Sequence, residues 1–171
     1  MAKINEFNTE RLNLRLMTEE EWSEFLFRVV YADECYFQFG EEKSEDLLTR
    51  FKKPFYHRAI YFSIHLPETD ELIGYVGYST DIQFIEYYIF DDHRRSGYAY
   101  EAILELMRKL FNGSLLGKRL DELHAWVTWD NTVSANLLEK LGFEPLEGYR
   151  IFDNGTAGKF FDLNLNKEDA A

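Results

Sequence analysis

The chain has 171 residues, of which 46% are apolar, and its 31 acidic residues outnumber its 19 basic ones, giving a formal net charge of −12. This length and apolar fraction suit one domain with a buried core, so we expect a single domain over residues 1–171. The negative charge argues against a nucleic-acid partner, because phosphate backbones would be repelled. It favours cationic partners such as amines or basic protein tails, or else it serves solubility alone.

Cysteine and histidine usage narrows the chemistry further. Cys35 is the only cysteine, which rules out an intramolecular disulfide and a cysteine-based metal site. The 4 histidines are scattered without the spacing of metal ligands, so we expect no metal. Residues 1–9 lack the apolar segment of a signal peptide, and no apolar run is long enough to span a membrane. We therefore expect a soluble protein in a reducing, cytoplasmic setting.

Apolar periodicity and capping signals predict the elements of the first third of the chain. Residues 12–16 alternate apolar and polar side chains, as in a half-buried strand. Thr18 and Glu21 form a capping box that opens a helix through residue 29. Residues 32–42 are expected to form a loop. A second helix is expected after Ser44, carrying Leu47, Leu48, Phe51 and Phe55.

Strand periodicity dominates from residue 59 onward. The expected elements are strands 60–66, 72–78 and 82–90, a helix 100–111, a strand 120–128, a helix 132–141, and strands 149–152 and 159–165. The turn Asp153-Asn154-Gly155 is expected to join the last two strands. The resulting order, β-α-α-β-β-β-α-β-α-β-β, predicts an α/β (α+β) fold with a mixed, mostly antiparallel central sheet and helices on both faces.

The turn at residues 94–99, Arg-Arg-Ser-Gly-Tyr-Ala, leaves an expected strand and opens an expected helix. A helix that begins here directs unpaired backbone N–H groups one way, at the positive end of its dipole. Gly97 lets the backbone approach a ligand closely, and Arg94 and Arg95 add positive charge. The stretch therefore predicts a phosphate-binding turn. By itself it also fits an ordinary strand-to-helix turn with solvated arginines.

Motifs along the chain resemble a known family. Arg94-x-x-Gly97-x-Ala99 is similar to the Q/R-x-x-G-x-G/A motif of the GNAT superfamily of N-acetyltransferases, and the order of elements is that of its fold. Further matches resemble the ribosomal-protein-alanine acetyltransferase (RimJ/RimL-like) branch and span nearly the whole chain. They are Thr9-Glu10-Arg11-Leu12, Gly97-Tyr98-Ala99-x-Glu101-Ala102, Asn131-x-x-Ser134-x-x-x-Leu138-Glu139-Lys140-Leu141-Gly142-Phe143, Glu147-Gly148-x-Arg150 and Asp162.

The resemblance implies an N-acetyltransferase that uses acetyl-CoA as co-substrate and no metal. In the family, the glycine-bearing turn binds the coenzyme's pyrophosphate through backbone N–H groups. The pantetheine arm lies between the strand before the turn and the strand after its helix, here residues 82–90 and 120–128. The residues expected to contact the coenzyme are Ile89, Phe90, Arg94, Arg95, Ser96, Gly97, Tyr98, Ala99, Tyr100, Asn131, Ser134 and Lys140.

The chain departs from the family where many members protonate the departing thiolate. Those members have a tyrosine at the position of Leu138, and leucine cannot donate a proton. Ser134 is the candidate acid in its place, as in the alanine-acetyltransferase branch, although it equally fits a simple first-turn helix serine. Arg95 and Tyr100 are bulkier than the residues that relatives carry beside the phosphates.

Acetyl transfer also needs a proton acceptor for the amine and a hydrogen-bond donor for the oxyanion. Glu86 is the candidate base, because strand alternation places it on one face with aromatic residues, where burial would raise its pKa. A solvent-facing strand glutamate is the alternative interpretation. Glu101 is a weaker candidate, and a water chain could replace either. For the oxyanion we expect a backbone N–H near Ile89.

We therefore expect an acyltransferase that catalyses direct attack of a primary amine on acetyl-CoA in a ternary complex. The expected acceptor is a protein N-terminal amine, a polyamine or an aminoglycoside, and the chain is expected to be a monomer or homodimer. The alternative is a non-catalytic acyl-CoA-binding regulatory module of the same fold, supported by the lack of a tyrosine at position 138.

Overall fold

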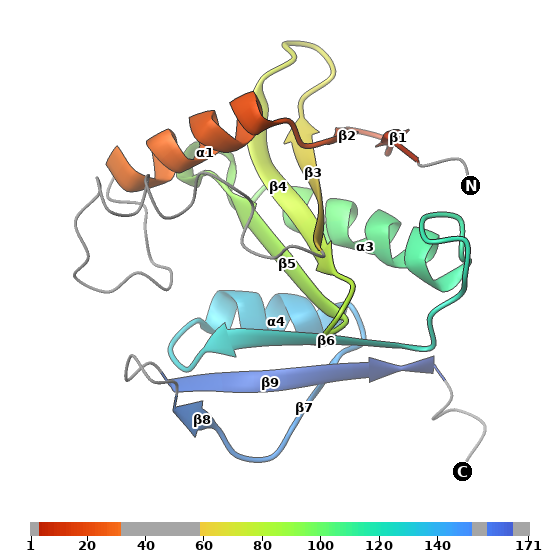
Figure 1. The fold of residues 1–171 in the computed structure, drawn as a ribbon. Coiled ribbons are helices and arrows are strands. Elements are labelled where there is room, and N and C mark those ends of the chain that lie inside the picture. The colour runs from red at the N-terminus through yellow and green to blue at the C-terminus, as the bar shows by residue number, and fades with distance from the viewer. Residues whose placement is uncertain (1–3, 32–58, 152–156, 166–171) are drawn as a thin grey trace.

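The computed structural model describes residues 4–31, 59–151 and 157–165 (Figure 1). The expected loop 32–42, the expected second helix, Cys35 and the expected 153–155 turn lie outside these residues. Within the described residues, no helix combines the length and apolar character needed to cross a membrane.

The strands of the described residues form one mixed sheet in the order β1-β2-β3-β4-β5-β6-β9-β7, with β8 also paired to β9. Every neighbouring pair is antiparallel except β5 and β6. The bounds are β1 Glu6–Asn8, β2 Asn13–Leu16, β3 Ala59–His65, β4 Leu72–Ser79, β5 Phe84–Ile89, β6 Glu122–Thr128, β7 Glu144–Pro145, β8 Arg150–Ile151 and β9 Ala157–Asn164.

Helix α1 (Glu19–Tyr31) covers one face of the sheet over β4 and β5 (Figure 1). Its expected capping box is confirmed: the Thr18 N–H donates to a Glu21 carboxylate oxygen at 2.9 Å, and the Glu21 N–H donates to the Thr18 hydroxyl at 3.1 Å. The face that it buries is largely aromatic. The cluster that α1 forms with the sheet consists of Trp22, Phe25, Leu26, Val29, Leu72, Tyr88 and Phe90.

Helices α3 (Tyr98–Phe111) and α4 (Thr132–Lys140) lie on the opposite face. The buried side of α3 carries Ala102, Ile103, Leu106, Met107 and Leu110, an apolar stripe with helical spacing. These residues join inward-facing residues of the sheet, and Leu138 of α4, in the main hydrophobic core. The fold class predicted from the sequence is therefore confirmed, with helices on both faces of a mostly antiparallel sheet.

The parallel pair of strands positions the site. β5 and β6 share one bridge, between Phe84 and His124, where the His124 N–H donates to the Gln83 carbonyl at 2.9 Å. Beyond that bridge no described residue of β5 pairs with β6, and the strands diverge toward their C-terminal ends (Figure 1). Backbone groups along the diverging edges therefore lack sheet partners.

Several boundaries differ from those expected. β5 begins at Phe84 because Gln83 takes a left-handed φ of 58°, and Ile82 is left exposed in the preceding turn. α3 begins at Tyr98, immediately after Gly97, so the expected start at residue 100 was wrong. The short strands β1 and β7 were missed, because segments of this length carry too little periodicity to detect.

Candidate functional site

The turn at residues 94–99 leads from β5, through a short 3-10 helix η1 (Asp91–His93), into α3. Arg95 and Gly97 both have left-handed backbone conformations, with φ values of 63° and 81°. Among the described residues, the N–H groups of residues 95–100 make no hydrogen bond, and residues 95–97 are exposed. A row of free N–H groups at the start of a 14-residue helix is well suited to bind a phosphate.

A network from the N-terminal motif holds this turn in place. The Arg11 guanidinium donates to the Ser96 carbonyl at 2.9 Å and to the Glu101 carboxylate at 2.7 Å. The Arg11 N–H and the Thr9 hydroxyl donate to the other Glu101 oxygen. Charge-assisted bonds of this kind are among the stronger ones. Arg11 was not among the expected site residues, although it belongs to one of the motifs that resemble the family. Its partners are 85 and 90 positions away, so no local pattern indicates these contacts.

Glu101 is therefore a poor proton acceptor. Burial acts to raise its pKa, but the hydrogen bonds from Thr9 and Arg11 outweigh this effect and hold the pKa below its usual range. A carboxylate that is ionised and tied to a guanidinium has little tendency to take up a proton at neutral pH. The lowered pKa argues against Glu101 as a base, and its bonds to Thr9 and Arg11 brace the turn.

Arg94 and Phe90, both expected at the coenzyme, are bonded within the protein. Arg94 donates to the Ile89 carbonyl at 2.8 Å, forms an ion pair with Asp91 and lies 5.1 Å from the centroid of the Tyr88 ring. The side chain of Phe90 is fully buried, its N–H donates to Ile73, and its carbonyl accepts from His93. These bonds brace the turn, and the contact of both residues with the coenzyme stays a prediction.

Positive charge reaches the turn from α4. Lys140, in the last turn of α4, places its ammonium 4.6 Å from the centroid of the Tyr100 ring, in the first turn of α3. Two residues expected to contact the coenzyme, far apart in sequence, thus meet beside the free N–H groups. The bulky Tyr100 therefore serves as a support for the lysine.

At the N-terminus of α4, Asn131 caps the helix. Its side-chain oxygen accepts the Ser134 N–H at 3.0 Å, which satisfies one of the helix's open donors. Ser134 itself lies half-buried in the first turn. Leu138, one turn further on, is fully buried in the core. A leucine side chain has no proton to donate, so position 138 supplies no acid to the site.

The ladder with β4 determines which way the backbone of β5 faces. Phe90 N–H donates to Ile73 at 3.0 Å, and in antiparallel ladders hydrogen-bonded pairs alternate with non-bonded ones. Ile89, opposite Gly74, therefore directs its N–H and C=O away from β4, toward the side where β6 diverges. The N–H expected near Ile89 as an oxyanion donor is thus on an open edge.

Glu86 lies on the α1 side of β5 and is mostly buried. Burial raises the pKa of Glu86 to about 7, an effect that a hydrogen bond from the Tyr61 hydroxyl, at 3.3 Å, partly offsets. Tyr61 reaches Glu86 by crossing over Gly77, where a Cβ atom would come within 2.5 Å of the tyrosine ring. The alternative interpretation, a solvent-facing strand glutamate, is wrong. The catalytic role stays a prediction.

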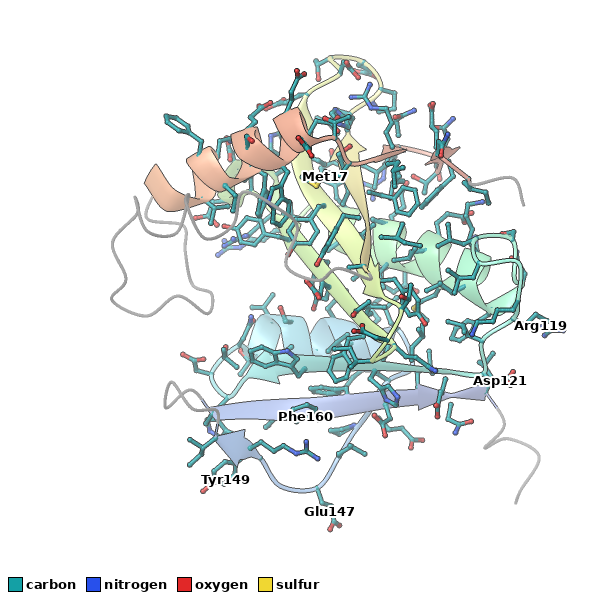
Figure 2. The ribbon with its side chains drawn as sticks, viewed as in Figure 1. Met17, Arg119, Asp121, Glu147, Tyr149 and Phe160 are labelled. Carbon is teal, nitrogen blue, oxygen red and sulfur yellow. The ribbon has the colours of Figure 1, made fainter. Side chains whose placement is uncertain are left out.

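The strand pairing shows that the face of β5 that carries Glu86 continues onto β6 and β9. Counting along the strands from the Phe84 and His124 bridge, Trp126 of β6 is level with Glu86, and Trp126 pairs with Phe160 of β9. Phe160 is labelled in Figure 2. In the adjoining row, His124 Nδ1 lies 2.8 Å from a carboxylate oxygen of Asp162. We did not anticipate this pair, since its members are 38 positions apart. A carboxylate on Nδ1 fixes the tautomer and leaves Nε2 as a proton acceptor.

Among the described residues, no group of three or more histidine, cysteine, aspartate or glutamate side chains could hold a metal ion. The candidate site brings together backbone donors, two carboxylates, one histidine and hydroxyl groups. These groups suit the binding of an anion and the transfer of protons.

The buried carboxyl of Glu86 predicts an unusual pH dependence of stability. Its pKa is about 7 in the folded chain against 4.5 when solvated, so the folded state holds the proton more tightly. The free energy of unfolding should therefore fall as pH rises from about 4.5 to about 7. Glu86→Gln removes the free-energy cost of ionising the buried carboxyl. It should therefore stabilise the chain by up to about 3 kcal/mol at pH 8, with little difference near pH 4.

Urea unfolding at a series of pH values measures this difference. The control is Glu122→Gln, which alters an exposed glutamate of β6 and should leave the pH dependence as it is. An equal effect of Glu86→Gln at pH 4 and pH 8 would contradict the assignment of a raised pKa.

Comparisons with known proteins bear on the fold and the family of the chain. No curated protein matches the chain. Among solved structures, spermidine N-acetyltransferase from Vibrio cholerae, in complex with CoA and spermine, is similar with a TM-score of 0.70 and 19% identity, over 93% of this chain and 98% of that one. Ribosomal-protein-S5-alanine acetyltransferase from Vibrio fischeri gives a TM-score of 0.69 and 18% identity, over 94% of this chain and 97% of that one.

An acetyltransferase of the GNAT family from Bacillus anthracis gives a TM-score of 0.70 and 18% identity, over 94% of this chain and 99% of that one. At these identities the structures show a shared fold. The family model described as an acetyltransferase (GNAT) domain matches residues 11–144, which include Arg11, the turn and α4. This chain therefore belongs to the GNAT acetyltransferase family.

Proposed function

We propose that the chain transfers the acetyl group of acetyl-CoA to a primary amine, by direct attack within a ternary complex. The observation that carries the proposal is the row of free N–H groups at residues 95–100, which opens beside the diverging ends of β5 and β6. A diphosphate needs such donors, and an amide-bearing arm needs unpaired strand edges. Acetyl-CoA carries both.

The coenzyme's pyrophosphate is assigned to the N–H groups of residues 95–100, with the charges of Arg95 and Lys140 beside it. Lys140 adjoins this turn through Tyr100. The arm is assigned to the open edge of β5 at Ile89, whose register turns its N–H away from β4. The Arg11 and Glu101 network holds the turn ready before the coenzyme arrives, which lowers the entropic cost of binding.

Three groups are assigned to the chemistry. Glu86, with its pKa raised to about 7 by burial, accepts the proton that the amine must lose. The Ile89 N–H stabilises the negative charge that develops on the carbonyl oxygen. Ser134, in the first turn of α4, is the candidate donor to the thiolate. His124, held by Asp162, is a second candidate proton acceptor on the same face as Glu86.

The acceptor is proposed to be a protein N-terminal amine or a small amine such as a polyamine or an aminoglycoside. Two similar structures are of enzymes named for spermidine and for a ribosomal protein. The face around Glu86 carries the aromatic residues Tyr61, Trp126 and Phe160, together with Asp162. Acidic and aromatic groups suit a cationic amine.

Substitution at Gly97 tests the phosphate-binding turn. Gly97→Val puts a branched side chain at an exposed position with a φ of 81°, where the backbone must approach the ligand closely. We expect acetyl-CoA affinity, measured by titration calorimetry, to fall by at least about 100-fold, roughly 3 kcal/mol.

Gly148→Val is the matched control. Gly148 is exposed and has a φ of 85°, and a Cβ atom added to it would meet no other atom within 4 Å. The substitution therefore imposes similar backbone strain away from the turn. Its coenzyme affinity should equal that of the wild type. Equal affinity for Gly97→Val would contradict the proposed binding mode.

Thiol release from acetyl-CoA, measured across a panel of amines, polyamines, aminoglycosides and N-terminal peptides, tests the reaction. We expect at least one class to be acetylated, with kcat/KM rising through about pH 7 as Glu86 loses its proton. Glu86→Gln should lower kcat on the order of 100-fold and remove that limb of the pH profile.

His124→Gln serves as the comparison. If the rise of kcat/KM through about pH 7 were lost in His124→Gln and kept in Glu86→Gln, His124 would be the base in place of Glu86. Tight coenzyme binding with no transfer to any amine of the panel would favour an acyl-CoA-binding module and contradict the proposal.

A further inference from the structure

Tyr87 carries a buried hydroxyl to which the proposed reaction assigns no role. It follows Glu86 on β5, so its side chain lies on the opposite face of the strand, with Ile85 and Ile89. There it packs against the core beneath α3 and α4. Among the described residues, its hydroxyl oxygen is shielded from solvent and has no hydrogen-bond partner.

The neighbour of this hydroxyl is Ser134. Burial raises the pKa of Tyr87 to about 12, and an interaction with the Ser134 side chain offsets part of that rise. The Ser134 side chain thus interacts with the Tyr87 hydroxyl, although no hydrogen bond of full geometry joins the two. One comes from the diverging edge of β5 and the other from the first turn of α4.

An unpaired hydroxyl away from water is costly, and the great majority of buried polar side chains have partners. A catalytic role or a bound ligand is one explanation for such an exception. Position 138 of α4 is a fully buried leucine, which has no hydrogen-bond donor in its side chain. Tyr87 brings a phenol to the start of the same helix from the opposite side.

We propose that the Tyr87 and Ser134 hydroxyls act as a pair that donates hydrogen bonds to the sulfur leaving the thioester. This inference rests on the acetyl transfer proposed above. It extends that reaction, because it assigns the stabilisation of the leaving group to a residue of β5. It also explains why the hydroxyl of Tyr87 has no partner within the described residues.

Each proton and electron pair in this step has a defined destination. The amine nitrogen forms a bond to the carbonyl carbon, and Glu86 takes a proton from that nitrogen. When the carbonyl re-forms, the carbon–sulfur bond breaks and its electron pair stays on sulfur. The hydroxyl pair donates to this sulfur, and solvent supplies the proton that completes the thiol. Because its phenol stays protonated at neutral pH, Tyr87 is available as a donor in every turnover.

The proposal is tested without knowledge of the acceptor by titrating the thiol of bound coenzyme A. The ultraviolet absorbance of the thiolate reports its protonation. Donors to the sulfur favour the thiolate, so the thiol pKa of the bound coenzyme should rise by about one pH unit in Tyr87→Phe and in Ser134→Ala relative to the wild type. Tyr78→Phe, a buried tyrosine of β4, should leave it unchanged.

Turnover with an acceptor from the panel gives the second readout. Tyr87→Phe should lower kcat on the order of 100-fold at unchanged coenzyme affinity. The double variant Tyr87→Phe with Ser134→Ala should be little slower than either single variant, because the hydroxyls act together. The melting temperature of Tyr87→Phe should not fall, since no hydrogen bond to a described residue is lost.

A bound thiol pKa that is the same in the wild type and Tyr87→Phe would overturn the proposal, as would an unchanged kcat. Either result would leave acetyl transfer itself intact. Failure of the wild type to bind coenzyme A would overturn both the transfer and this inference.

Discussion

The single bridge between β5 and β6 is the constraint on which the site depends. Because the strands are parallel and separate after Phe84 and His124, each keeps an edge without sheet partners. One short strand then presents three different groups: Glu86 on the α1 face, Ile89 N–H at the open edge, and Tyr87 on the α4 face. Had the pairing continued to Ile89 and Thr128, the sheet would have closed over this edge.

The turn depends in addition on the N-terminal segment. Arg11 bonds both the Ser96 carbonyl and the Glu101 carboxylate, so the start of the chain is tied to the start of α3. The turn in which Arg95 and Gly97 take left-handed conformations is thereby held in place. A strained and exposed turn of this kind persists when its surroundings determine it, and preorganised donors bind an anion at a lower entropic cost.

Local features were predictable from the sequence, and long-range ones were not. The turn at residues 94–99, the capping box of Thr18 and the face occupied by Glu86 follow from short motifs and strand alternation. The burial of Glu86 requires Tyr61 to cross over Gly77, a contact between three strands. The His124 and Asp162 pair and the approach of Tyr87 to Ser134 likewise arise only when distant strands and helices come together.

In the proposed binding mode, the coenzyme lies on the N–H groups of residues 95–100 and along the open edge of β5. Amide resonances of isotope-labelled protein, followed by NMR as coenzyme A is added, test it most directly. We expect the largest shifts at residues 95–100 and at Ile89, with small shifts on β1 and β2. Saturable binding whose largest shifts lie away from this turn and from β5 would contradict it.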